Sequence, residues 1–127
     1  MIPRTSHRVV KQALQIALAD LETTPYFPTI ARKLGVSERF LRRAFNSVHG
    51  LPPQRYVRML KLSRAQLALA SARDPSVTVA ETALRLGFTE LGRFSVRYRE
   101  MFGERPSTTL QRALRRHEGK KRAPKPE

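Results

Sequence analysis

The sequence has no cysteine, few acidic residues and no long hydrophobic run. The lack of cysteine excludes a disulfide framework, a thiol nucleophile and any cysteine-ligated metal site. His7, His49 and His117 lie far apart, and none has the i, i+4 spacing that puts two metal ligands on one helical face. No apolar run approaches the ~20 residues that span a bilayer. We therefore expect no cofactor and no membrane partner. Because the chain offers no nucleophile–base pair and no metal set, we also expect no enzymatic activity.

The scarcity of acidic residues leaves a large positive charge. Ten Asp and Glu stand against 25 Lys and Arg, which gives a net charge of +15. This charge favours a polyanionic partner, either nucleic acid or an anionic membrane surface. Basic residues concentrate in segments 37–61 and 112–125. The first segment lies in a strongly periodic region and should belong to a fold. The second is expected to end in a basic, disordered tail, 117–127.

The apolar residues follow helical periods throughout, and no stretch alternates as a strand does. A chain of 127 residues has room for one domain or two very small lobes. We predict an all-α fold of seven helices, with lobes at about 6–52 and 75–116 joined by a long helix at about 53–72. Ser37, Thr78 and Thr89 are the predicted N-caps of later helices. The predicted helices cover residues 6–22, 28–34, 37–49, 53–72, 78–87, 89–102 and 107–116.

Two halves of the sequence repeat each other. The spacing Ala-x3-Gly occurs at 31–35 and 83–87, and an aromatic-x4-Gly-x2-Pro spacing occurs at 45–53 and 98–106. The offset is 52 residues for the first pair and 53 for the second, so the second unit has one extra residue. A short helix, a turn with glycine and a second helix with an aromatic residue form the helix-turn-helix pattern, whose second helix can enter the major groove. The alternative is a helical bundle whose turns only look similar.

The helix predicted at 37–49 has an apolar face and an opposite polar face. At helical spacing, the polar face carries Arg39, Arg42, Arg43 and Asn46. Arginine can form a bidentate contact with guanine. This face is therefore a candidate surface for base contacts, and a solvated face is the alternative. The aromatic residues are expected in the core, because a base-stacking platform needs exposed rings. His49 is expected at a helix end and not as a ligand.

The long helix predicted at 53–72 has apolar residues on more than one face, as expected of a helix that packs against two partners. A helix of 20 residues is about 30 Å long. Successive major grooves on one DNA face are roughly 34 Å apart. Such a helix could hold two recognition helices, at about 37–49 and 89–102, so that one monomer contacts two successive grooves.

Two stretches, IARKLGVSERFLRRAF and VAETALRLGFTELGRFSVRYREMFGERPSTTL, resemble the DNA-binding domain of the AraC/XylS family of bacterial transcription regulators. The resemblance runs from about Ile30 to Leu114. Its most specific residues are Gly87-Phe88, Phe94, Phe102-Gly103 and Pro106. It implies seven helices, two helix-turn-helix lobes joined by a long helix, and binding to an asymmetric promoter site. Family members are mostly activators that contact RNA polymerase.

The resemblance also implies which side chains face the bases. In the first recognition helix they are Arg39, Arg42 and Arg43. In the second, they are Leu91, Gly92, Arg93, Val96 and Arg97. The family often has a polar residue at the first of these five positions and arginine at the fourth. Leucine and valine can touch a thymine methyl group but cannot hydrogen-bond, so the second lobe is expected to rely on its two arginines. Candidate phosphate contacts are Ser37, Arg55, Arg58 and Thr89. The long-helix cations Arg55, Arg58 and Lys61 are equally compatible with a solvated surface.

The expected function is sequence-specific binding of double-stranded promoter DNA by a transcription regulator. The expected role is activation through RNA polymerase, in the cytoplasm at the nucleoid, with this domain as a monomer. The chain has no room for the effector or dimerisation domain of most family members, so it is either an excised domain or a naturally short member. One alternative is an architectural protein that binds nucleic acid by shape without base readout. Another is a membrane-surface helix, which several helices with buried aromatic residues disfavour.

Overall fold

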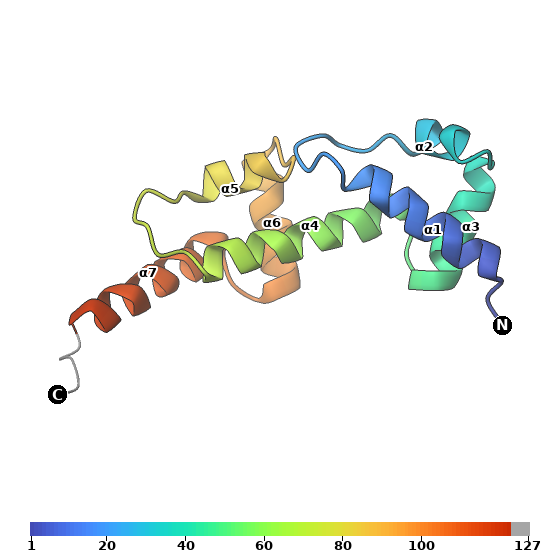
Figure 1. The fold of residues 1–127 in the computed structure, drawn as a ribbon. Helices are drawn as coiled ribbons and strands as arrows, with labels where there is room; N and C mark the ends of the chain where they lie inside the picture. The colour runs from blue at the N-terminus through green and yellow to red at the C-terminus, as the bar shows by residue number, and fades with distance from the viewer. Residues whose placement is uncertain (123–127) are drawn as a thin grey trace. The chain divides into compact units, whose positions relative to one another are not determined.

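A computed structural model describes residues 1–122 of the chain. The described part consists of helices without a strand, which confirms the predicted all-α fold (Figure 1). In chain order, the helices are α1 (Arg4–Ala17), α2 (Phe27–Lys33), α3 (Glu38–His49), α4 (Pro53–Ala70), α5 (Val79–Arg85), α6 (Leu91–Phe102) and α7 (Pro106–Arg122).

The chain divides into two compact units, and the boundary falls inside α4. Unit 1 is Met1–Lys61, and unit 2 begins at Leu62. The first half of α4 therefore belongs to the first helix-turn-helix unit and its second half to the other, as a linking helix requires. The apolar surface of α4 is less fully covered than the sequence indicated, since the side chain of Leu67 is 64% exposed.

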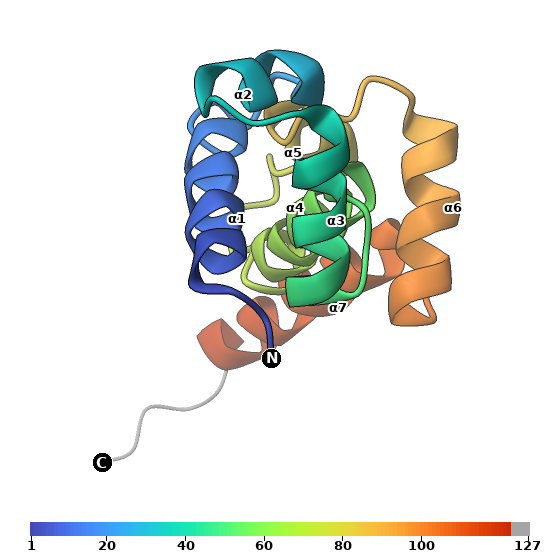
Figure 2. The ribbon, with the colours of Figure 1, turned by 90° about the vertical axis from the view of Figure 1, so that its right-hand side faces the viewer.

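Unit 1 has a core made by the first three helices and the start of α4. Figures 1 and 2 show α2 across the ends of α1 and α3, and each pair of these helices is in contact. The largest buried side chain is Phe45, whose ring meets Phe27 edge-on at a centroid distance of 6.1 Å. From α4, Val57 joins this core. The core cluster is Val9, Val10, Ala13, Ala17, Phe27, Ile30, Ala31, Leu41, Ala44, Phe45 and Val57.

Helix α1 ends earlier than predicted. Its predicted range was 6–22, but the helix covers Arg4–Ala17. The side chain of Asp20 accepts a hydrogen bond from the Glu22 amide at 3.1 Å and another from the Thr23 hydroxyl at 2.6 Å. Aspartate bonded in this way to the backbone two residues on stabilises a turn in place of a further helical turn. Leu18 and Leu21 are consequently half-buried residues outside α1.

The two helix-turn-helix turns have the same hydrogen-bond pattern. In unit 1, the amide of Val36 donates to the carbonyl of Ala31 at 3.0 Å. In unit 2, the amide of Phe88 donates to the carbonyl of Ala83 at 2.9 Å. The glycine between each pair has positive φ, +70° at position 35 and +85° at position 87. Ala31 and Ala83 are buried. The repeat inferred from residue spacing is therefore also a repeat of backbone structure.

In unit 2, α6 is fixed to α7 by a chain of hydrogen bonds. The buried hydroxyl of Tyr98 donates to Thr109 Oγ1 at 2.7 Å. Thr109 donates in turn to Glu104, which also accepts two hydrogen bonds from Arg112, at 2.6 and 2.8 Å. The hydrogen bonds of Arg112 and then Thr109 hold the pKa of Glu104 below its ordinary value. Burial raises the pKa of Tyr98.

Helix α7 continues beyond its predicted end at 116 and reaches Arg122. Residues 117–122 were expected to belong to a disordered tail, so this part of the prediction is wrong. The segment is rich in arginine, lysine and glutamate, which have good helix propensity even where the helix is solvated. The remaining part of the predicted tail, 123–127, lies outside the described residues.

Candidate nucleic-acid interface

The first candidate recognition helix, α3, presents the arginine face that the sequence predicted. Ser37 caps the helix, because its Oγ accepts a hydrogen bond from the Phe40 amide at 3.0 Å. Leu41 and Phe45 are buried, so the opposite face of α3 points to solvent. On that face, the exposed side chains include Arg39, Arg42, Arg43 and Asn46. Within residues 1–122, none of these arginines is paired with a carboxylate.

The second candidate recognition helix, α6, has a less polar exposed face. Phe94 and Tyr98 are buried on one side. On the other side, Gly92 is exposed and Val96 is 58% exposed. Arg93 is also exposed, but its Nε lies 3.5 Å from Glu90 Oε2. Arg97 is only half-exposed. The first turn of α6 thus offers one fully exposed arginine, which already has an acidic neighbour.

The start of α6 differs from the prediction. Thr89 was expected to cap this helix, but the N-cap residue is Glu90 and it makes no side-chain capping bond. The extra residue of the second repeat lies between Gly87 and Phe94, which shifts the helix start relative to Ser37 of the first repeat. The exposed Thr89 therefore remains a candidate phosphate contact without a capping role.

Arg99 lies exposed on α6, and it was not predicted from the sequence to be a site residue. At the offset of 53 residues that relates Phe45 to Tyr98, Arg99 takes the position of Asn46. The repeat alone could therefore have added Arg99 to the candidate residues.

The cations at the start of α4 have different environments. Arg55 is exposed, and Arg58 is half-buried. Lys61 is buried, and its Nζ donates a hydrogen bond to the carbonyl oxygen of Thr23 at 3.1 Å. Burial lowers the pKa of Lys61, and the negative charge of Asp20 partly opposes this change. Lys61 therefore holds the loop after α1, and the expectation of a solvated or phosphate-bound side chain is wrong.

His49, at the end of α3, packs against an aromatic ring. Its imidazole stacks on Tyr56 with ring centroids 3.9 Å apart. Burial lowers the pKa of His49, and the nearby charge of His7 lowers it further. The neutral imidazole is therefore favoured over the cation at the end of α3.

Two hollows occupy equivalent places in the two units. In unit 1, a hollow of about 430 Å³ lies between the start of α2, α3 and the start of α4; Arg42, Pro53 and Gln54 are among its lining residues. In unit 2, a hollow of about 330 Å³ lies between the start of α5, α6 and the start of α7. Each hollow lies beside the exposed face of its recognition helix.

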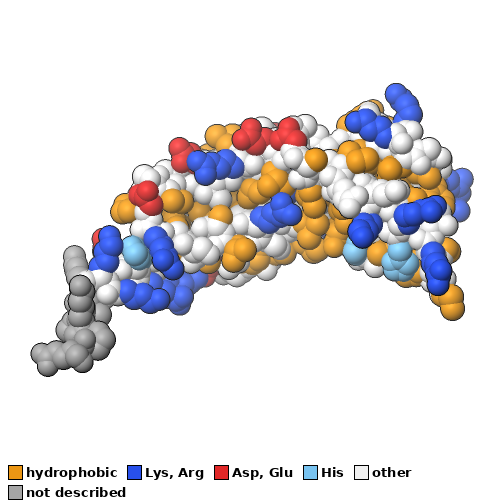
Figure 3. All heavy atoms as spheres, viewed as in Figure 1, with side chains coloured by type: hydrophobic (Ala, Val, Ile, Leu, Met, Phe, Trp, Pro, Cys, Tyr) orange, Lys and Arg blue, Asp and Glu red, His pale blue; other side chains and the backbone are white. Residues whose placement is uncertain are grey.

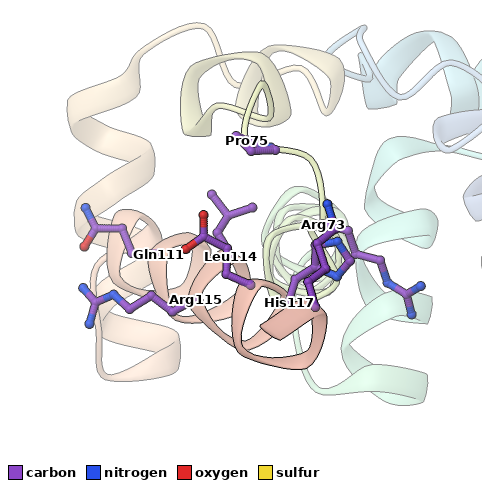
Figure 4. Close-up of a pocket in the computed structure, with 8 residues that line it drawn as sticks. Arg73, Pro75, Gln111, Leu114, Arg115 and His117 are labelled. Atoms are coloured by element: carbon purple, nitrogen blue, oxygen red, sulfur yellow. The ribbon is translucent and has the colours of Figure 1, made fainter. Parts of the chain in front are cut away.

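A larger hollow, of about 530 Å³, lies elsewhere in unit 2 (Figure 4). Arg73 and Pro75 line it from the loop after α4, and Leu114, Arg115 and His117 line it from α7. None of its lining residues belongs to α6. Its cations are therefore separate from the surface of the recognition helix.

Basic side chains lie on both units (Figure 3). In this view, lysine and arginine side chains spread over α1–α3 in unit 1 and gather along α7 in unit 2. Across residues 1–122, histidine and acidic side chains form no group of three that could hold a metal ion. In the same part of the chain, no helix is long and apolar enough to cross a bilayer.

Comparison with known proteins identifies the family. The family model described as "Helix-turn-helix domain" matches residues 30–112. A probable thc operon regulatory protein of Rhodococcus erythropolis is 32% identical over 103 residues, which cover 81% of this chain and 31% of that protein. The XylDLEGF operon transcriptional activator 2 of Pseudomonas putida is 39% identical over 75 residues, which cover 59% of this chain and 48% of that protein. The chain thus spans a third to a half of the length of these curated relatives.

A solved structure agrees with this relationship. The crystal structure of a probable AraC family transcriptional regulator from Rhodopseudomonas palustris superposes with a TM-score of 0.73 at 34% identity. The match covers 84% of this chain and 97% of that one. The two helix-turn-helix units of this chain, together with the family model and the relatives it matches, show that it carries an AraC-type DNA-binding domain. The chain therefore belongs to the AraC/XylS family of transcription regulators.

Proposed function

We propose that the chain binds double-stranded promoter DNA in a sequence-specific manner, with α3 and α6 in successive major grooves. The observation that carries the proposal is the exposed face of α3, with three arginines that pair with no carboxylate within residues 1–122, opposite a buried apolar face. Arginine in the major groove can donate two hydrogen bonds to guanine, and such contacts specify sequence. Asn46 belongs to the same face. In unit 2, the base-facing residues proposed are Gly92, Arg93, Val96 and Arg97.

Phosphate contacts would fix the position of the protein on the duplex. We assign this role in unit 1 to Ser37, Arg55 and Arg58, and in unit 2 to Thr89. Ser37 can serve both the helix and the DNA. Its oxygen accepts the capping bond, while its hydroxyl hydrogen can be donated to a phosphate oxygen.

The regulatory role proposed is transcription activation. Relatives in Pseudomonas putida are named activators of the XylDLEGF operon. By analogy, this chain would recruit RNA polymerase at a promoter and act at the nucleoid in the cytoplasm. We propose that the DNA-binding domain acts as a monomer, because its two recognition helices are in one chain.

A second candidate function is architectural binding by DNA shape, which the poorly polar face of α6 favours. Such a protein would lose affinity as salt increases but would show no preference among sequences. The two functions therefore differ in one measurable property, the ratio of specific to non-specific affinity.

Selection of binding sites from a random duplex pool tests the proposed function. We expect an asymmetric site, bound at least 10³-fold more tightly than random DNA in the same salt, as is typical of specific binding. Enrichment of no sequence, together with salt-dependent binding to every duplex, would support the architectural function instead.

A further inference from the structure

We propose that the unit 2 hollow between α6 and the start of α7 is a binding site for a phosphodiester group of the DNA backbone. The proposal rests on the proposed function, since the ligand belongs to the bound duplex. The site would hold the second unit on DNA through Arg99 and Arg105. No role in DNA binding was predicted for either residue from the sequence.

The hollow combines two cations with small polar groups. Its lining residues include Ser95, Val96 and Arg99 from α6, and Arg105 and Ser107 from the start of α7. Among residues 1–122, no carboxylate lines the hollow. A guanidinium group can bind two phosphate oxygens through parallel hydrogen bonds, and a serine hydroxyl can donate another. The lining therefore matches an anion with several acceptor oxygens.

The two arginines are available for a ligand. Both are exposed, and neither forms an ion pair within the described part of the chain. Neighbouring arginines of unit 2 differ in this respect, since Arg93 lies beside Glu90 and Arg112 is bonded to Glu104. Glu90 and Glu104 of this unit thus pair with cations that do not line the hollow.

The location of the hollow agrees with a DNA ligand. Val96 lies both on the lining of the hollow and on the exposed face of α6. An anion in the hollow would therefore lie directly beside the surface that faces the major groove. Backbone phosphates border that groove, and contacts with them fix the orientation of a recognition helix.

Comparison with unit 1 shows that the arginine pair is a property of unit 2. At the offset of 53 residues, Ser95 and Ser107 correspond to Arg42 and Gln54, which line the unit 1 hollow. That hollow also contains Glu38 and thus combines one arginine with one carboxylate. Unit 2 therefore has fewer hydrogen-bonding groups toward the bases but a more cationic hollow beside them. This difference indicates that unit 2 contributes mainly backbone affinity.

The test compares two double variants of equal charge. Arg99→Ala/Arg105→Ala removes both cations of the proposed site. Arg73→Ala/Arg115→Ala removes two cations of the larger hollow and is the matched control. Affinity for the selected duplex is measured from low to moderate salt. For the site variant, we expect at least a tenfold loss at low salt and a decrease of about 0.9 in the salt slope, because one neutralised phosphate contributes about that much. The control should retain the wild-type slope.

A second measurement locates the phosphate. In duplexes that carry one uncharged methylphosphonate at a time, wild type should lose affinity at a particular position in the half of the site bound by unit 2. The Arg99→Ala/Arg105→Ala variant should be insensitive at that position. The Arg99→Lys/Arg105→Lys variant should recover most of the salt slope. Circular dichroism checks that each variant remains helical.

Equal losses in the two alanine variants, or a site variant that keeps the wild-type sensitivity at that methylphosphonate position, would overturn the proposed site. These results leave the proposed function intact if wild type still selects a sequence. Conversely, binding without sequence preference would refute sequence-specific recognition, whereas the salt slopes of the two alanine variants would still test the hollow. Absence of any duplex binding would refute both proposals.

Discussion

The imidazole of His49 lies flat on the ring of Tyr56, with the two ring planes 7° apart. Phe45 lies beside both rings, at centroid distances of 6.2 Å from each. This aromatic group connects the end of α3 to the start of α4. The second repeat places Tyr98, Phe102 and Thr109 at the corresponding positions. The contact between α3 and α4 in unit 1 therefore depends on an aromatic stack that includes a titratable histidine. The equivalent contact between α6 and α7 in unit 2 depends on a chain of hydrogen bonds.

The first prediction concerns pH and His49. Its pKa in the folded protein is below the ordinary value of 6.5. As pH falls below about 6.5, the unfolded chain binds more protons than the folded one, so the free energy of unfolding should decrease. His49→Phe keeps an aromatic ring, as at Phe102, and removes this titration. Denaturant unfolding between pH 5 and 8 should show a shallower pH dependence for the variant. Wild type and variant both retain His7 and His117, so a difference in slope reports on His49. Identical slopes for the two proteins would refute the lowered pKa assigned to His49.

The second prediction concerns the bond between Tyr98 and Thr109. Thr109→Val leaves the buried tyrosine hydroxyl without this acceptor, which should cost about 1–3 kcal/mol of stability. In the Tyr98→Phe/Thr109→Val variant, both partners are apolar, so the combined loss should be smaller than the sum of the single losses. Thermal unfolding of the four proteins measures this coupling. Strict additivity would mean that the hydrogen bond contributes nothing.

The third prediction concerns base recognition by α3. Arg43→Ala should weaken binding to the selected site by about 1–3 kcal/mol and relax the preference at one or two base pairs. Arg8→Ala removes the same charge from the exposed side of α1 and serves as the control. Competition binding on specific and random duplexes is the measurement. An equal loss on both kinds of DNA would assign Arg43 to a phosphate.

The fourth prediction is that the two units contribute unequally to specificity. Arg93→Ala/Arg97→Ala should lower affinity on all sequences and flatten the salt dependence, with little change in the preferred sequence. Arg93 must break its ion pair with Glu90 to contact DNA. The free-energy cost should be small, because exposed ion pairs contribute about 0–1 kcal/mol. A scan of base substitutions across the selected site checks this. If base changes in the two halves of the site cost the same, about 1–3 kcal/mol each, unit 2 recognises sequence as well as unit 1 does.

Local sequence signals predicted the features that depend on neighbouring residues. Ser37 and Thr78 cap their helices as expected. The hydroxyl oxygen of each accepts a hydrogen bond from the backbone amide three residues later. The alanine and glycine of each turn were identified from spacing alone, since only small residues fit the crossing and positive φ favours glycine. The arginine face of α3 followed from the position of the buried residues Leu41 and Phe45.

Features that depend on distant contacts were not predictable in this way. Lys61 looked like one more surface cation, but its bond to the Thr23 carbonyl joins residues 38 positions apart. The end of α1 was missed for a different reason, since it depends on short-range side-chain bonds of Asp20 to Glu22 and Thr23, which compete with a continuing apolar stripe. Arg99 and Arg105 come together only because α7 starts beside α6, and no spacing in the sequence shows this.

Gly92 occupies, on α6, the position that Arg39 has on α3. Its backbone has no positive φ, and a Cβ atom there would meet nothing within 4 Å. A Cβ atom can therefore be added at this exposed position without displacing a neighbour, and most side chains would also favour the helix over glycine. In the proposed complex, one substitution at this position would therefore add a side chain to the base-contacting surface of unit 2 while the scaffold remains unchanged.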